Sequence, residues 1–424
     1  MFDVLPSDMM LRLPSLLGVA FVFVCLYALS YRRKAISWML VGKTALVHIV
    51  LALMMLHWSW GAYAVEALAS GVSALYRAAD AGSSFLFGAL AQPAAGSWGF
   101  VFAFRVLPII VFFGAFMALL SYFGVVQLIV SGIRKVAQPF WGTGGAETTC
   151  AIANSFLGQT EAPLLIKQYL ESMSPSSIFV VMVAGMGTIQ APLMAVYGAM
   201  GVPLKHILAA SIMAVPATLM CAKMVYPLDD AQEKLAQRDV VIESGPSSWT
   251  EAIARGTTDG LMLALNVGAM LIAFIALISL LNMALGSLSG RVNGALSCAG
   301  FSWMIPTLSL EKILGYVFAP LGWLLGFSGQ QAMKLGELVG IKIAANEMIA
   351  YSELVTSALS ERGVILATYA LCGFSNFSSI GIQVGGIGIL APNQRSLLAK
   401  LGMRAVFVAA LANVYSAFVV NLIL

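Results

Sequence analysis

The sequence predicts an all-α polytopic membrane protein with eight transmembrane helices, two re-entrant helical hairpins and inverted repeats. Of its 424 residues, 60% are hydrophobic and 10% are charged, whereas a soluble domain carries about 25% charged residues. Apolar runs that reach past the roughly 20 residues needed to cross a bilayer follow one another with short connections. Such spans are helical, and no alternating strand pattern of a membrane barrel competes.

The polar composition excludes several classes of function. The net charge is only +4, and the basic residues cluster at span ends, so a nucleic-acid partner is not expected. The five cysteines are scattered and odd in number, which does not indicate a disulfide framework. The three histidines are not spaced like metal or haem ligands. The bilayer is therefore the partner that the composition predicts.

Eight apolar runs are candidate spans. The first lacks a basic segment before it and ends in basic residues rather than a cleavage site, so we expect a retained helix and not a signal peptide. The spans are residues 13–29, 36–56, 101–123, 178–200, 207–226, 260–281, 364–382 and 405–424. Residues 63–90, 125–140 and 310–325 are predicted to be helices that lie at the interface or pack obliquely.

Basic residues between the spans predict the orientation. Three clusters fall on one side of the membrane if the N-terminus is outside, and positively charged loops are cytoplasmic. The clusters are Arg32, Arg33 and Lys34; Arg134 and Lys135; and Arg395, Lys400 and Arg404. The polar stretch 228–248 then also lies inside.

Two segments are predicted to enter the membrane and return. Residues 146–170 form two apolar arms hinged at 158–163, and residues 336–354 have the same build with Asn346 and Glu347 at the turn. An arm of about 12 residues at 1.5 Å per residue reaches little more than halfway through a ~30 Å core. Irregular backbone at that depth is tolerated only where protein or a water-filled cavity covers it.

A span interrupted by small and polar residues follows each hairpin. Thr188 and Leu193 lie 27 and 32 positions after Glu161, while Asn376 and Ser379 lie 29 and 32 positions after Glu347. The topology places the first hairpin on the inner side and the second on the outer side, so the two units are inverted. Inverted repeats whose interrupted helices meet near the midplane are typical of secondary transporters.

The side chains at the two hinges indicate the kind of solute. Amides, hydroxyls and two carboxylates gather there, without arginine or lysine at either hinge, so an anion would be repelled. The set suits a neutral solute rich in hydrogen-bond donors, and a cation remains possible. The residues are Gln159, Thr160 and Glu161 from the first unit, with Asn346, Glu347, Asn376, Ser378 and Ser379 from the second.

A coupling ion would use oxygen atoms at a broken helix. Asn154 and Thr188 fall near the breaks, and their side chains with unwound carbonyls suit sodium, although both can also serve only to join helices. Glu161 and Glu347 keep proton coupling open, and Glu161 could instead be a structural acid paired with Lys167. A membrane-embedded enzyme, such as a lipid-modifying transferase, would need a nucleophile with a base or a metal cluster; neither is visible, so an enzyme is not expected.

Four motifs, in the same order along the whole chain, resemble the bacterial branch of the concentrative nucleoside transporters. They are "GQTEAPLL" from Gly158, "LALNVGAMLIAF" from Leu263, "ANEMIAYSEL" from Ala345 and "ALCGFSNFSSIGI" from Ala370. The resemblance implies a trimeric, sodium-coupled symporter of the inner membrane. It would import nucleosides such as uridine, cytidine and adenosine by an elevator movement of a transport domain past a scaffold. A proton-coupled symporter of the same fold is the alternative.

The resemblance also implies a role for individual residues. Gln159, Thr160 and Glu161 would face the nucleobase, with Leu193 packed against it, and Glu347, Asn376 and Ser379 would hold the ribose while Phe374 lines the pocket. Sodium would bind the side chains of Asn154 and Thr188 and the carbonyls of Leu157 and Ile189. Met348 and Ser375 replace the Phe and Ala usual in the family, beside proposed ligands. The proton-coupled branch has Ser where Thr160 stands, and Thr160 and Thr188 favour sodium.

The same resemblance divides the chain into scaffold and transport segments. The predicted parts are N-terminal scaffold helices (1–125), a first transport repeat (126–227), a cytoplasmic linker (228–256), a scaffold span with an outer loop (257–308) and a second transport repeat (309–424).

Overall fold

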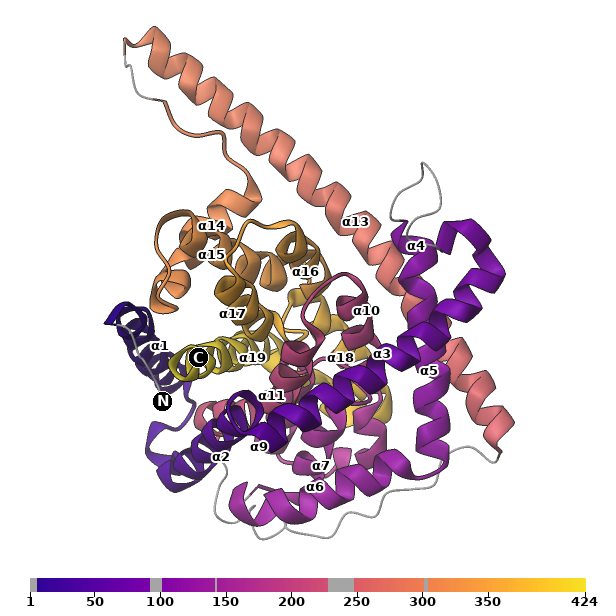
Figure 1. Cartoon of the computed structure of the whole chain (residues 1–424). Coiled ribbons are helices and arrows are strands. Elements are labelled where there is room, and N and C mark those ends of the chain that lie inside the picture. The colour runs from indigo at the N-terminus through magenta and orange to yellow at the C-terminus, as the bar shows by residue number, and fades with distance from the viewer. Residues whose placement is uncertain (1–5, 92–100, 142, 228–247, 301–303) are drawn as a thin grey trace.

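The most buried helices lie at the centre of the protein and are apolar on all sides. The computed structural model describes residues 6–91, 101–141, 143–227, 248–300 and 304–424. At the centre, 94% of the span formed by α9 (Pro175–Gly187) and α10 (Ala191–Ala199) is buried, as is 89% of α11 (Leu204–Val225). α19 (Arg395–Ile423) packs against both α9 and α11 (Figure 1). A helix that is hydrophobic on every face is expected in such a core.

The outer spans present apolar faces to their surroundings. In the apolar stretches of α1 (Pro6–Leu29) and α2 (Trp38–Leu56), only 22% of the residues are buried. The buried share is 28% for the span that ends in α5 (Leu107–Tyr122) and 6% for α13 (Trp249–Cys298). Among the described residues, seven helices are long and apolar enough to cross a membrane. The prediction of an all-helical, multi-pass membrane protein is confirmed.

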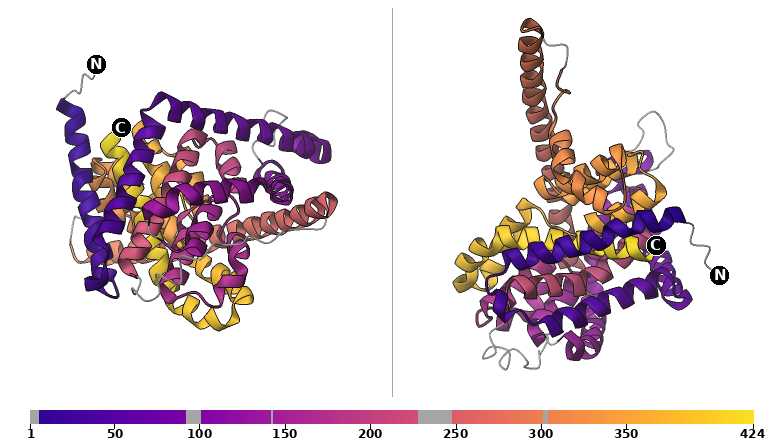
Figure 2. Two further views of the ribbon diagram at one scale, coloured as in Figure 1. Left: turned by 90° about the horizontal axis from the view of Figure 1, so that it is seen from below. Right: turned by 90° about the vertical axis from the view of Figure 1, so that its left-hand side faces the viewer.

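Three further helices connect the spans, as the sequence predicts. α3 (Ser59–Phe87) extends across the molecule from α2 to the short α4 (Phe102–Arg105) and α5, and Figure 2 shows it along one edge. α6 (Val125–Trp141) leads from α5 into the first hairpin. α14 (Leu310–Leu324) packs against α15 (Gly329–Ala344) after a bend of 113°.

Both re-entrant hairpins are made of short helices that turn back. The first consists of α7 (Gly145–Asn154), the 3-10 turn Ala162–Ile166 and α8 (Lys167–Leu170). The second consists of α15 and α16 (Glu347–Thr356), with Asn346 at the turn. Ten-residue helices such as α7 and α16 are too short to span a ~30 Å core.

The two broken spans repeat each other in register. α9 begins at Pro175 and α17 (Glu361–Leu371) at Glu361, while α10 begins at Ala191 and α18 (Phe377–Leu390) at Phe377. Both pairs of starting points are therefore 186 residues apart (175 and 361, 191 and 377). The serine before α9 and the serine before α17 each cap their helix through the side chain. This spacing supports the predicted duplication of the unit.

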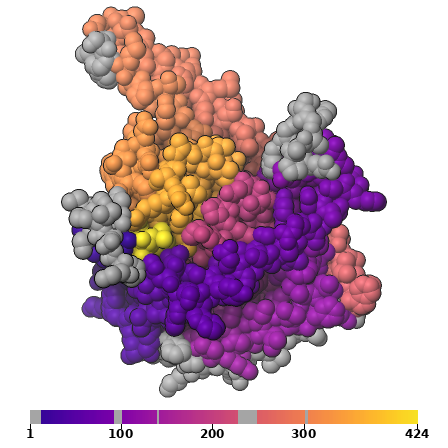
Figure 3. Space-filling view, in the orientation of Figure 1, coloured from indigo at the N-terminus to yellow at the C-terminus, as the bar shows by residue number. Residues whose placement is uncertain are grey.

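The helix predicted over 260–281 is longer than expected at both ends. α13 runs from Trp249 to Cys298, and its upper part projects beyond the body of the protein (Figures 1 and 3). Ser248 caps its start, and no proline interrupts it. Its polar side chains hold the chain that returns, because Asn282 accepts a hydrogen bond from Leu310 N at 2.7 Å and Asn293 accepts one from Ile305 N at 2.9 Å. Residues expected in an outer loop are thus largely helical.

Glycines allow α13 to approach α5 closely. A Cβ added to Gly256 would lie 2.5 Å from Ala118 Cβ, and one added to Gly260 would lie 2.9 Å from Ile110 O. This small-residue spacing of four is a common packing surface between membrane helices. It fixes α13 against α5 and so forms one wall of the site described next.

Candidate functional site

The hinge of the first hairpin depends on Gly158. Its φ of 97° favours glycine, and a Cβ there would overlap Gln190 Oε1. Beyond this glycine the chain turns so that Gln159 is buried, whereas Thr160 and Glu161 are exposed. Thr160 lies against α18, since a Cβ added to Gly386 would be 3.3 Å from Thr160 Cγ2. The hinge therefore directs Gln159 into the protein and leaves Thr160 and Glu161 accessible.

The hinge of the second hairpin is a helix cap. Asn346 Oδ1 accepts a hydrogen bond from Ile349 N at 2.9 Å, which places Glu347 in the first turn of α16. Glu347 is only 5% exposed, and its oxygens accept hydrogen bonds from Tyr197 Oη at 3.0 Å and Asn376 Nδ2 at 3.1 Å. A buried carboxylate is tolerated where it is hydrogen-bonded in this way.

A chain of hydrogen bonds joins the two hinges. Gln159 Nε2 donates to Ser379 Oγ at 3.3 Å, and Ser379 Oγ donates to Asn376 Oδ1 at 3.2 Å. Asn376 in turn donates to Glu347. Gln159, Glu347, Asn376 and Ser379 are four of the eight predicted substrate residues, so the structure brings half of that set into one network.

The other four residues lie around this network. Leu193 on α10 is 3% exposed and Phe374, in the break between α17 and α18, is 7% exposed. Both are apolar and buried, and their roles beside a nucleobase stay predictions. Thr160 and Glu161 are the exposed members, and Glu161 points away to a cavity on the side of α13.

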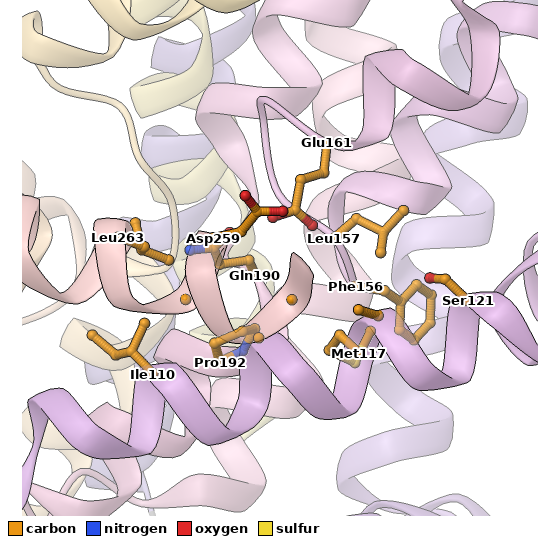
Figure 4. A pocket seen from close by; sticks show the side chains of 14 residues that line it. Ile110, Met117, Ser121, Phe156, Leu157, Glu161, Gln190, Pro192, Asp259 and Leu263 are labelled. Atoms are coloured by element: carbon orange, nitrogen blue, oxygen red, sulfur yellow. The ribbon is translucent and has the colours of Figure 1, made fainter. Parts of the chain in front are cut away.

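This cavity of about 80 Å³ lies between the first hinge and the wall made by α5 and α13. Glu161 and Asp259 point toward each other across it (Figure 4), and the two like charges repel. Gln190, Pro192 and Met117 are among the other side chains that line it. The cavity therefore lies between Glu161 of the first hairpin and Asp259 of α13.

The residues predicted to hold sodium lie where the first hinge meets the break between α9 and α10. Ala191 N donates to Phe156 O at 3.3 Å, which joins the two segments. Asn154, Thr188, Leu157 and Ile189 are all 8% exposed or less. Asn154 Oδ1 is buried and accepts no hydrogen bond within the described residues. An unpaired buried amide oxygen beside unwound backbone fits a hard cation.

The network contains two residues that the sequence did not indicate as site residues. Tyr197 donates to Glu347, and Gln383 Nε2 donates to Gln159 Oε1 at 3.1 Å and to Met182 O at 3.2 Å. Tyr197 follows Leu193 by four residues and Gln383 follows Ser379 by four, so each lies on the same helix face as a predicted ligand. The pair also occupies corresponding positions in the two repeats, a signal that the spacing of 186 would have given.

Comparisons with protein families agree with this architecture. Residues 17–90 match the family described as the Na⁺ dependent nucleoside transporter N-terminus, and residues 206–421 match its C-terminus. Residues 103–204 match a family described as nucleoside recognition. Together the three models cover both repeats and most of the chain.

Relatives and solved structures extend over nearly the whole chain. Nucleoside permease NupC of Helicobacter pylori is 38% identical over 96% of this chain and 97% of its own length. An uncharacterized transporter of Haemophilus influenzae is 40% identical, with 97% of each chain covered. Sodium/nucleoside cotransporter 1 of Mus musculus is 35% identical over 97% of this chain and 64% of its own length.

Two structures of CNTnw show the same fold. One, inward-facing and substrate-bound, has a TM-score of 0.88 at 36% identity and covers 97% of this chain and 99% of that one. The other, a variant in an outward-facing state, has a TM-score of 0.90 at 36% identity and covers 98% and 99%. Taken with the family matches, they show that this chain belongs to the concentrative nucleoside transporter family, whose members are transporters and not enzymes.

Proposed function

We propose that the protein is a sodium-coupled symporter that imports nucleosides such as uridine, cytidine and adenosine across the bacterial inner membrane. The observation that carries this proposal is the hydrogen-bonded network between the hinges, with Glu347 at one end and Gln159 at the other. A nucleoside offers ribose hydroxyls and a base with donors and acceptors, and these are the partners that such carboxylates and amides bind. The relatives with this activity support the assignment.

In this proposal each hinge binds one part of the nucleoside. Glu347, Asn376 and Ser379 hold the ribose, because carboxylate and amide oxygens accept hydrogen bonds from hydroxyls. Gln159, Thr160 and Glu161 face the nucleobase, with Leu193 and Phe374 packed around it. The present cavity of about 80 Å³ is smaller than the ~300 Å³ of a typical ligand pocket. Of the proposed substrate residues only Glu161 lines this cavity, so in this proposal a nucleoside binds in a conformation in which the first hinge is more open.

Sodium would be held by the side chains of Asn154 and Thr188 and by the carbonyls of Leu157 and Ile189. The unpaired Asn154 Oδ1 supports this set. The ion would join the first hinge to the broken helix and so stabilise the conformation that binds nucleoside. A tenfold sodium gradient and 100 mV together supply about 3.7 kcal/mol per ion, enough for accumulation of roughly several hundredfold.

The proposed movement is an elevator shift of the two transport repeats, 126–227 and 309–424, past a scaffold that includes α5 and α13. The scaffold would form a homotrimer with the N-terminus outside the cell. The exposed apolar residues of α13, such as Leu265, Ile272 and Leu280, support contact with lipid or with other copies along this helix. The remainder of the partition assigns 1–125 and 257–308 to the scaffold and 228–256 to a cytoplasmic linker, of which 228–247 lies outside the described residues.

Uptake into proteoliposomes tests the proposal. Labelled uridine should accumulate when a sodium gradient is imposed at fixed pH and should not accumulate with a proton gradient alone. Extracted uridine should be chemically unchanged. Accumulation driven by protons without sodium would instead establish the second candidate, a proton-coupled nucleoside symporter of the same fold. The facing carboxylates of Glu161 and Asp259 favour that candidate, because a shared proton would relieve their repulsion.

A further inference from the structure

Lys342 is a buried lysine in the second hairpin, and it forms no salt bridge with any residue that the structure describes. It lies on α15 and is 1% exposed. Its ammonium group donates to Ala370 O at 3.0 Å and to Asn413 Oδ1 at 2.6 Å, both of them neutral acceptors. Another buried lysine, Lys223, instead pairs with Glu147 at 2.8 Å. The carboxylate of Glu347 acts on this ammonium only at longer range. A buried ammonium that is not in contact with a carboxylate needs a further source of stabilisation.

The end of a half-helix supplies that stabilisation. Ala370 is the last residue but one of α17, which stops at the break before α18. The final carbonyls of a helix have no partner within it and carry the negative end of its dipole. The Lys342 ammonium therefore lies where a cation is favoured, in the middle of the protein.

The first repeat has the same half-helix end without a lysine. With the spacing of 186 residues, Ala370 corresponds to Ala184 near the end of α9, and Lys342 corresponds to Phe156. Ala184 O accepts a hydrogen bond from Thr188 Oγ1 at 2.9 Å, and Thr188 is a proposed sodium ligand. The end of α9 therefore lies beside the proposed sodium site, whereas the end of α17 lies beside the ammonium group of Lys342.

Asn413 of α19 connects these two ends directly. Its Oδ1 accepts from Lys342, and its Nδ2 donates to Gly187 O, the last residue of α9, at 2.8 Å. A Cβ at Gly373, in the break between α17 and α18, would lie 2.6 Å from Asn413 Oδ1, so a glycine there leaves space for this amide. A single side chain therefore contacts the ends of both half-helices.

We propose that Lys342 is a built-in cation that takes, in the second repeat, the place of the coupling sodium in the first. The protein then binds one sodium ion per nucleoside, because the second site is filled by its own ammonium group. Removal of that group, with space left behind, should open a site for a second monovalent cation on Ala370 O and Asn413 Oδ1. The inference rests on the proposed sodium coupling for its comparison between repeats.

Thermal unfolding of the purified full chain in detergent tests the inference. Sodium is varied against choline, and the slope of stabilisation with the logarithm of sodium concentration reports the number of ions that the folded protein binds. Lys342→Ser should double the slope of the unaltered protein. Lys342→Met, which fills the space with an apolar chain, should not increase the slope and should lower the unfolding temperature. Lys334→Ser is the matched control, since Lys334 on the same helix is only partly buried and forms ion pairs with Glu337 and Glu353.

The outcomes separate this inference from the proposed function. An equal slope in the unaltered protein and in folded Lys342→Ser would overturn the inference. If sodium stabilises Lys342→Ser but not the unaltered protein, sodium coupling in the first repeat is wrong and the role of Lys342 is supported. A flux measurement needs no variant: one sodium ion per uridine in proteoliposomes of the unaltered protein supports the inference, and two overturn it.

Discussion

The carboxylate of Glu347 is positioned by two neutral donors and can accept further hydrogen bonds. Tyr197 Oη and Asn376 Nδ2 each occupy one of its oxygens, and a carboxylate has about four acceptor sites. Glu347→Gln replaces charge-assisted hydrogen bonds to ribose with weaker ones of similar shape. A loss of about 1.5 to 3 kcal/mol corresponds to a fall of roughly 10- to 100-fold in uridine affinity.

Uridine binding and initial uptake rates of the purified variant check this prediction. Tyr197→Phe serves as the comparison, because it removes one orienting donor and leaves the charge in place, so its effect should be smaller. Uptake by Glu347→Gln within twofold of the unaltered protein would contradict a direct role for this carboxylate.

Asn154 gives a second prediction at the scale of one residue. Its buried Oδ1 has no hydrogen-bond donor in the described residues, so a bound cation would supply its partner. Asn154→Ala should raise the sodium concentration for half-maximal uptake by about tenfold, a loss of about 1.4 kcal/mol. Ser155→Ala is the matched neighbour, since Ser155 Oγ donates to Ser211 O at 3.5 Å and is not a proposed ligand. An unchanged sodium dependence in Asn154→Ala would remove this ligand from the site.

The sequence could predict individual polar residues but not their partners. Glu347, Asn376 and Gln159 are polar groups in apolar runs, and such groups are identifiable because burying them is costly. Tyr197 and Lys342 were harder to assign because tyrosine and lysine also occur as ordinary packing or interface residues. Only the folded chain shows that Tyr197 reaches Glu347, 150 residues away.

Among the helices, the contact between α5 and α13 gives a stability prediction. A methyl group at Gly256 would lie 2.5 Å from Gly114 O and from Ala118 Cβ, so Gly256→Ala forces the helices apart. Overpacking of this kind costs about 1 to 3 kcal/mol. The unfolding temperature in detergent should fall.

Gly290→Ala on the same helix is the control, because no atom of the described residues lies within 4 Å of an added Cβ there. Alanine has the better helix propensity by about 1 kcal/mol, so this variant should be at least as stable as the unaltered protein. Equal unfolding temperatures for the two variants would show that the close approach does not contribute to stability.

Helix ends were predictable only where the sequence carries a stop signal. Small and polar residues around Thr188 and Asn376 predicted both broken spans, and the structure places breaks there. α13 was underestimated because hydropathy measures apolar length, whereas a helix continues while its backbone bonds are made and no proline interrupts it. The side chains of Asn282 and Asn293 find partners only in the returning chain.

For the whole molecule, the facing acids Glu161 and Asp259 belong to the two bodies that the proposed movement separates. When both are ionised, their repulsion disfavours the conformation described here. Asp259→Asn keeps the size and removes one charge, so it should populate this conformation more strongly, roughly threefold to fivefold for a weak surface interaction.

A cysteine in place of Ser121, which lines the same cavity, measures that shift. In a background without Cys25 and Cys298, a thiol reagent should modify this cysteine more slowly in Asp259→Asn than in its parent. Equal or faster modification would contradict the assignment of the hairpin and α13 to bodies that move apart.

The inverted repeat was predictable because its signal lies within the chain, in two similar units with basic residues that predict opposite orientations. The approach of the first hinge to α13 was not predictable, because no motif around Asp259 indicates which distant segment this side chain contacts. Relative placement of distant segments depends on side-chain contacts such as those between α5 and α13, and these appear only in three dimensions.

The shared register of the broken spans also bears on ancestry. Two repeats with matching boundaries and opposite orientation are most simply copies of one ancestral segment, joined after duplication. Such an ancestor would have needed to insert into the bilayer both ways round, which requires loops with too few positive charges to fix a single orientation. The lysine in one copy, at the position where the other copy has a phenylalanine, would then date from after the fusion, when the two copies no longer had to be the same.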